Sequence, residues 1–234
     1  MNISLERPWH YKRFSVPRTR AIRALNNTYV INTIARKSLS YAKEELESKR
    51  RSNFNYKVPT ISGDNISLAK QKSEVIKLID GAINRDLYSQ SIINGVAIAE
   101  DYLSGSLITI LKKFPEKLSV NSKTVDLSLI VNSTNIDELL YKIIIKQVNS
   151  IFYDSPSKYL SYIENILSVK LSDDIKNKYI EIKATRDILV HNNGIINILY
   201  IQKSGVASRA KEEDDGKEII LDSNYFDESI RSMK

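Results

Sequence analysis

The chain has 234 residues, 42% of them hydrophobic, which is enough for one globular core with an extension or for at most two small domains. It contains no cysteine, so disulfide scaffolds, zinc fingers and cysteine nucleophiles are excluded. Its seven glycines and five prolines are too few for a loop-rich or all-β protein, and its formal net charge is +7.

Positive charge is concentrated near the N-terminus. Residues 1–73 hold fifteen Lys and Arg against five Asp and Glu, a net charge of +10, so the rest of the chain carries −3. Such an asymmetry is typical of a protein that binds a polyanion, most often a nucleic acid. A solvated basic helix face explains it equally well, and at this point both interpretations stand.

The first half of the chain is predicted to form three helices, with a turn-rich linker between the first two. Their approximate limits are residues 17–48, the linker at 49–65, then 66–88 and 89–114, where Pro115 stops the third helix. In the third helix Glu100 interrupts an apolar stripe. A carboxylate in such a position needs a partner or a raised pKa.

The second half begins with a polar connection that includes a short predicted strand at residues 125–131. Helices follow at residues 136–152 and 156–167, and a charged exposed loop at 211–217 precedes a last helix that starts near Ser223. The absence of any apolar run near 18 residues, and of a signal peptide, predicts a soluble cytoplasmic protein with no membrane contact.

The stretch SDDIKNKYIEIKATRDILVHNNG, residues 172–194, has clear helix punctuation. Ser172 is a good N-cap, and Asn193 with Gly194 is a typical exit from a helix. Its apolar stripe is interrupted by Arg186. A cation therefore interrupts the apolar stripe of this helix, as Glu100 interrupts the stripe of the helix predicted at residues 89–114.

Asp187 and His191 are one turn apart on one face of this helix, so the carboxylate is expected to hold the imidazole in one tautomer. Arg186 is placed to bind a phosphate through two hydrogen bonds and to stabilise developing charge, and His191 to move a proton near neutral pH. These residues suit phosphoryl-transfer chemistry without a metal. The structural alternative is a lone histidine that stabilises the C-terminal end of the helix dipole.

Residues 186–191, with the sequence RDILVH, resemble the signature of HEPN-domain proteins. That signature is an arginine, a polar residue, a few mostly apolar residues and a histidine in the last core helix of an all-α bundle. Residues 97–118 resemble the earlier helix of the same family, which often carries an acidic residue, here Glu100, and ends in a Phe-Pro break. The resemblance covers about residues 66–203.

The resemblance implies a metal-independent endoribonuclease that needs no cofactor. It also implies a homodimer in which two Arg–His pairs face one RNA-binding cleft, with Glu100 paired to Arg186 within a chain or across the dimer. HEPN proteins of this kind are toxins or antiphage-defence effectors, with an antitoxin or another defence protein as a partner. Some carry a tyrosine two places after the histidine, which a partner modifies, but here that position is Asn193.

Two further groups are candidates for binding RNA. Asn192 is a candidate contact to a phosphate or a base. In the N-terminal segment, aromatic residues interleave with Lys12 and Arg13, a pattern that can stack bases and hold phosphates. A packed N-terminal arm is an equally good explanation of that segment. With two histidines in the chain, no His/carboxylate metal cluster and no Ser-His-Asp set can be assembled.

The sequence therefore predicts an all-α, HEPN-like antiparallel helical bundle, residues 66–234, with a basic N-terminal arm and helix, residues 1–65, packed on it. The predicted activity is RNA cleavage with Arg186, His191, Asp187 and Glu100 as catalytic residues. One alternative is a non-catalytic HEPN-like module for dimerisation or for binding a partner or RNA. Another is a plain RNA-binding protein that works through residues 1–57.

Overall fold

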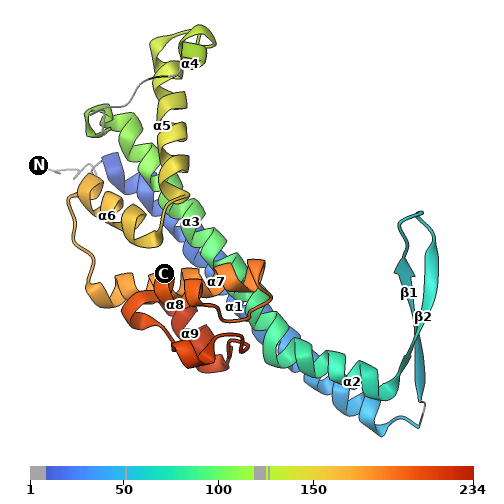
Figure 1. The fold of residues 1–234 in the computed structure, drawn as a ribbon. Helices are drawn as coiled ribbons and strands as arrows, with labels where there is room; N and C mark the ends of the chain where they lie inside the picture. The colour runs from blue at the N-terminus through green and yellow to red at the C-terminus, as the bar shows by residue number, and fades with distance from the viewer. Residues whose placement is uncertain (1–8, 51, 119–124, 126) are drawn as a thin grey trace, which may run out of the picture.

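Two long helical segments run antiparallel along the molecule, and the remaining elements are arranged around them (Figure 1). The computed structural model describes residues 9–50, 52–118, 125 and 127–234, with side chains from residue 15 onward. The chain is predominantly helical, which confirms the predicted class. Within the described residues, no helix combines the length and apolar character that a membrane span requires.

The elements follow in the order α1 (Trp9–Ser48), β1 (Asn53–Pro59), β2 (Asn65–Gln71), α2 (Lys72–Gly81), a π-helical turn η1 (Ala82–Asp86), α3 (Leu87–Lys113), α4 (Leu127–Val131), α5 (Ile136–Phe152), α6 (Pro156–Leu167), α7 (Asp173–His191), α8 (Ile198–Ser204) and α9 (Ser223–Ser232). Single 3-10 turns lie at Pro115–Lys117, Gly205–Ala207 and Glu212–Asp214.

The second and third predicted helices are one continuous helical segment, α2–η1–α3, so the predicted break near residue 88 was wrong. No glycine or proline interrupts residues 82–91, and nothing local therefore ends the helix there. The π turn leaves a carbonyl without its usual intrahelical donor. Arg36 of α1 donates from Nε to the carbonyl of Ile83 at 2.9 Å and supplies a donor at this turn.

Residues 53–71 form a β-hairpin, which corrects the predicted linker at 49–65 and the predicted helix over 66–71. The two strands pair antiparallel, with Asn53 opposite Gln71 and Pro59 opposite Asn65. Apolar and polar residues alternate in both strands, and this period of two is the signal for a strand. The hairpin stands at the far end of the α1 and α2 pair, away from the other helices (Figure 1).

The C-terminal helices pack against α3 through two apolar clusters. One joins α3 to α7, α8 and α9 and includes Ile92, Val96, Ile182, Ile188, Tyr200 and Phe226. The other joins α3 to α5, α6 and the start of α7 and includes Leu107, Leu111, Ile144, Val148, Tyr159 and Tyr179. The predicted helices at 136–152 and 156–167 are confirmed as α5 and α6, but the strand predicted at 125–131 is wrong, since α4 lies there.

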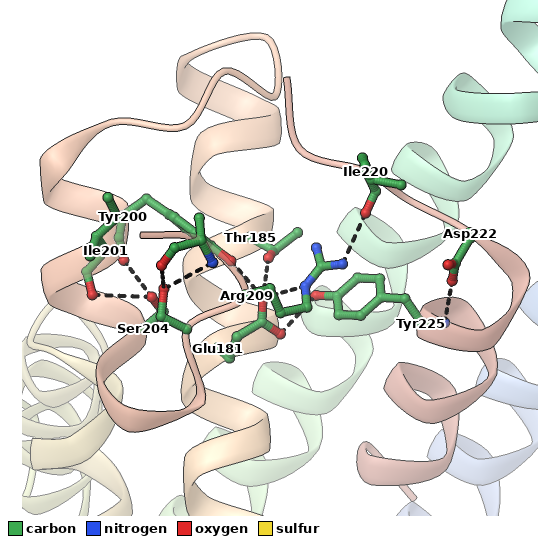
Figure 2. A network of polar contacts seen from close by, with 11 residues as sticks. Glu181, Thr185, Tyr200, Ile201, Ser204, Arg209, Ile220, Asp222 and Tyr225 are labelled. Atoms are coloured by element: carbon green, nitrogen blue, oxygen red, sulfur yellow. Dashed lines mark hydrogen bonds and ion pairs between the residues drawn. The ribbon is translucent and has the colours of Figure 1, made fainter. Parts of the chain in front are cut away.

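Helix α7 is held by the buried carboxylate of Glu181, which accepts one hydrogen bond from α7 itself and three from other parts of the chain (Figure 2). Oε1 accepts from Thr185 Oγ1 at 2.7 Å, from Tyr200 OH at 2.8 Å and from Arg209 Nε at 3.0 Å. Oε2 accepts from Tyr225 OH at 3.0 Å. Donors to both oxygens and one cation offset the cost of burying this carboxylate.

The tyrosines of this network stay protonated over the ordinary pH range. Burial, and then the nearby charge of Glu181, raises the pKa of Tyr200 to about 12. The same two causes raise the pKa of Tyr225 further. Both hydroxyls therefore remain donors to Glu181, and α8 and α9 stay fastened to α7.

We expect Glu181→Ala to lower the free energy of unfolding by about 3 kcal/mol, because it leaves Arg209 and two tyrosine hydroxyls without their acceptor. Urea denaturation followed by far-ultraviolet circular dichroism measures the change. The matched control is Glu213→Ala, an exposed glutamate that should alter stability by less than about 0.5 kcal/mol. Equal stabilities of the two variants would show that the network does not hold the bundle together.

Candidate functional site

Both ends of α7 form as the sequence predicts. Ser172 Oγ accepts from the backbone N–H of Ile175 at 3.4 Å, and the backbone N–H groups of Asn192 and Gly194 both donate to the carbonyl of Ile188 at 2.9 Å. Asn193 and Gly194 have φ of 52° and 75°, in the left-handed region. A Cβ at residue 194 would also lie 3.3 Å from Leu189 Cδ2, so this exit favours glycine.

The ion pair expected between Glu100 and Arg186 is present within one chain. Arg186 Nη2 lies 2.9 Å from Glu100 Oε2, and Arg186 Nη1 lies 3.0 Å from Asp187 Oδ1. Lys183 completes the group, with Nζ 3.2 Å from Glu100 Oε1 and 3.1 Å from Asp187 Oδ1. We call these four residues the α3–α7 charge cluster.

The charge cluster is mostly shielded from solvent and is formally neutral. Its side chains are 11% to 28% exposed, and two acids balance two bases. Burial raises the pKa of the adjacent Tyr159 and Tyr179, and the Glu100 carboxylate adds to both increases. The two tyrosines therefore stay neutral beside the cluster, and the charges balance within it.

His191 is exposed at the last position of α7, and among the described residues its imidazole takes part in no hydrogen bond or ion pair. The predicted contact from Asp187 to His191 is not formed. The Asp187 carboxylate instead accepts from Arg186 and Lys183, two cations that form charge-assisted hydrogen bonds with it.

Arg186 and His191 point to different sides of the helix. Five residues correspond to a rotation of about 140° and a rise of about 7.5 Å in an α-helix. Arg186 faces Glu100 on α3, whereas His191 faces solvent at the helix end. Within one chain the two side chains therefore lie on different sides of α7.

The turn after His191 is fixed by two other segments. Arg85, from the π turn, donates from Nη2 to the carbonyl of Asn193 at 3.3 Å and pairs through Nε with Glu218 at 2.7 Å. The backbone N–H of Ile219 donates to the carbonyl of Gly194 at 2.8 Å. These contacts hold the C-terminal end of α7 in place and leave the imidazole open.

Of the three residues predicted to contact RNA, the structure describes the side chain of Asn192. The Asn192 amide donates to the carbonyl of Ile195 at 2.6 Å, so this donor serves the turn. The side chains of Lys12 and Arg13 lie outside the described residues.

Sequence reasoning missed Lys183 and Arg85. Lys183 could have been found from its spacing of four residues from Asp187 on one helix. Arg85 is brought to the turn only by the tertiary fold.

Within the described residues, no group of three or more His, Cys, Asp or Glu side chains is placed to hold a metal ion. Comparison of the chain with protein-family models, with curated proteins and with solved structures gives no match.

The contributions of Glu100 and Arg186 to the free energy of unfolding should be coupled. We expect the double variant Glu100→Gln/Arg186→Gln to be more stable than the sum of the single variants predicts, by about 1–2 kcal/mol, because each single change leaves a shielded charge without its partner. Urea unfolding of the four proteins measures this coupling. The exposed pair Asp154 and Lys158, 2.9 Å apart, is the control and should couple by less than about 0.5 kcal/mol.

Proposed function

We propose that this chain is a HEPN-like, metal-independent endoribonuclease that acts as a homodimer. The observation that carries the proposal is an arginine anchored between α3 and α7, with a solvent-exposed histidine at the end of the same helix. The anchoring acid, Glu100, is the residue that the family resemblance assigns to this pair. A role as a toxin or antiphage-defence effector follows from the resemblance alone.

In the proposed reaction the ribose 2′-hydroxyl attacks the adjacent phosphorus. His191, as general base, takes the hydroxyl proton while the new P–O bond forms. The P–O5′ bond then breaks, and the leaving oxygen takes a proton from His191 of the second copy, which acts as general acid. The products are a 2′,3′-cyclic phosphate and a 5′-hydroxyl. Arg186 stabilises the charge that develops on the phosphate.

The two acidic residues have the role of positioning Arg186. Glu100 holds one side of the guanidinium at 2.9 Å and Asp187 the other at 3.0 Å. Arg186 offsets one of the two negative charges, and Lys183 offsets the other. Pre-set orientation of a cation is what stabilises a transition state more than a ground state. Asp187 thus acts through the arginine in this proposal and not through the imidazole.

A homodimer suits the separation of Arg186 from His191. Because the two side chains leave α7 about 140° apart, one chain presents them on different sides. A second copy related by a two-fold axis would bring two such helix ends together around one RNA strand. Each copy would then contribute one arginine and one histidine to the cleft.

A second candidate is a non-catalytic module in which the charge cluster only shapes a binding surface. The observation in its favour is that Arg186 is already paired with two carboxylates, which leaves less of its charge for a phosphate. Exposure of His191 favours the enzyme, since a general base must reach its substrate.

Incubation of a mixed RNA pool with the purified protein in EDTA tests the enzyme directly. We expect cleavage that leaves 2′,3′-cyclic phosphate ends, and a loss of about 100-fold or more in His191→Ala and in Arg186→Ala. Glu213→Ala is the matched control and should cut like the wild type, because residue 213 is exposed and outside the proposed site.

Cleavage by His191→Ala at the wild-type rate would overturn the proposed mechanism. If neither the wild type nor any variant cuts RNA, and the wild type still binds it, the non-catalytic module becomes the better account.

A further inference from the structure

Helix α1 packs through one side and leaves the opposite side in solvent. On the packed side Leu25 is buried in the α3 cluster, and Asn32 donates to the carbonyl of Leu87 and to the hydroxyl of Ser91. On the opposite side, residues spaced alternately by four and by three positions are all exposed, and we call this row the α1 seam. It consists of Val16, Arg20, Arg23, Asn27, Val30, Ile34, Lys37, Tyr41, Glu44 and Ser48.

The spacing of the α1 seam is that of a helix paired with another helix along its length. Steps of four and three residues repeat every seven, and such a row stays in contact when two helices coil around each other. The centre of the row is apolar, since Val30 and Ile34 are 51% and 60% exposed and the adjacent Ile31 is 66% exposed. Aliphatic side chains grouped in this way mark an interaction surface.

The two ends of the α1 seam carry complementary groups. Arg20 and Arg23 precede the apolar centre, and Tyr41 and Glu44 follow it. Among the described residues, neither arginine forms an ion pair, and Glu44 forms none. An arginine pairs with a carboxylate and also stacks on a tyrosine ring. A helix of the same sequence that runs in the opposite direction therefore supplies a partner for each end.

A second copy of α1, placed antiparallel about a two-fold axis at the level of Asn32, matches the α1 seam with itself. Every seam residue then lies opposite a seam residue of the other copy, and each contact forms twice by symmetry. The opposed residues are Val16 with Ser48, Arg20 with Glu44, Arg23 with Tyr41, Asn27 with Lys37, and Val30 with Ile34.

Other alignments of the same two rows lose this match. A shift of one copy by seven residues in one direction places Arg20 opposite Lys37, where two like charges repel. In the other direction it places Ile34 opposite Lys37 and separates it from an aliphatic partner. A parallel pair places each Arg20 opposite the other Arg20 and each Glu44 opposite the other Glu44. Of these arrangements, the unshifted antiparallel one alone combines opposite charges with an apolar centre.

The α1 seam is long enough for a stable contact between two copies. From Val16 to Ser48 it runs about 48 Å at 1.5 Å per residue, and a helix with its side chains is about 11 Å wide. A strip of this size covers roughly 530 Å² on each copy and roughly 1,100 Å² over both. A specific interface requires about 1,000 Å² or more.

A nucleic acid fits the α1 seam less well than a second helix does. Binding of a phosphate backbone depends on cations spread along the contact. The central turns carry Val30, Ile31 and Ile34 in place of cations, and Glu44 and Glu45 follow at one end. The seam therefore lacks the continuous positive charge that a polyanion requires.

We infer that two copies of the chain pair along the α1 seam, antiparallel about a two-fold axis beside Val30 and Ile34. The inference does not rest on the proposed RNA cleavage. Helix α7 packs on α3, and the seam lies on the side of α1 that faces away from α3. The pairing is thus a separate contact from the proposed RNA cleft at α7.

Introduced cysteines test the pairing and its register, because the chain contains none. Arg23→Cys and Tyr41→Cys are combined in one chain, which is then mildly oxidised. The two positions are about 27 Å apart on their own helix, so a disulfide between them must join two copies. We expect a covalent dimer on a non-reducing gel. Either single variant should give at least tenfold less, since antiparallel pairing keeps like positions equally far apart.

The matched control combines Arg23→Cys with Ser48→Cys, which is on the same seam seven residues beyond Tyr41, and should also give at least tenfold less dimer. Equal yields from the two double variants, or dimers from a single variant, would overturn the inference. Absence of a cross-link in every variant would overturn it as well. Loss of RNA binding in Arg20→Ala/Arg23→Ala would then identify this face as a nucleic-acid surface.

Sedimentation tests the pairing without a cross-link. Val30→Lys/Ile34→Lys brings ammonium groups of both copies together at the centre of the pair and should halve the mass of the wild-type assembly. Val206→Lys/Ile220→Lys adds the same charge at two exposed apolar residues outside the seam and should leave the mass unchanged. Far-ultraviolet circular dichroism checks that both variants are folded. Equal masses for the wild type and the seam variant would exclude the seam as an interface.

Discussion

The buried carboxylate of Glu181 is the contact on which the C-terminal half of the molecule depends. It fastens α8, the segment around Arg209 and α9 to a single position on α7. Burial of a charge at this position is tolerated because each donor is already in place. The same helix carries the α3–α7 charge cluster on another side, so its rigid anchorage sets where Arg186 and His191 lie.

The sequence predicts those parts of the fold that depend on local signals. Helical periodicity and caps locate α5, α6 and both ends of α7. The interruption of two apolar stripes singles out Glu100 and Arg186, and the family resemblance implies that they pair, as the structure shows. The hairpin was missed because its alternation is brief and lies between long helices. The contacts of Glu181 were missed because Tyr200, Arg209 and Tyr225 reach it only through the tertiary fold. Those of Asp187 were missed because Lys183 lies on the same helix at the same spacing of four residues as His191, and the cation pairs with the carboxylate.

The shielded charge cluster and the exposed apolar surface of the hairpin lie in two different regions of the molecule. In the bundle, acids and bases neutralise each other around Arg186, and the exposed imidazole lies at the end of α7. At the tip of the α1 and α2 pair, the exposed apolar side chains are Tyr56, Ile66 and Leu68 of the hairpin and Leu78 of α2. In the proposed reaction a second copy completes the cleft, because Arg186 and His191 of one chain diverge.

In the proposed reaction the 2′-hydroxyl of RNA is the nucleophile. Incubation of the wild-type protein with an RNA, and with the same RNA methylated at every 2′-oxygen, tests this role of the hydroxyl. We expect cleavage of the unmodified RNA and none of the methylated RNA. Cleavage of both at equal rates, or of neither, would exclude the proposed reaction.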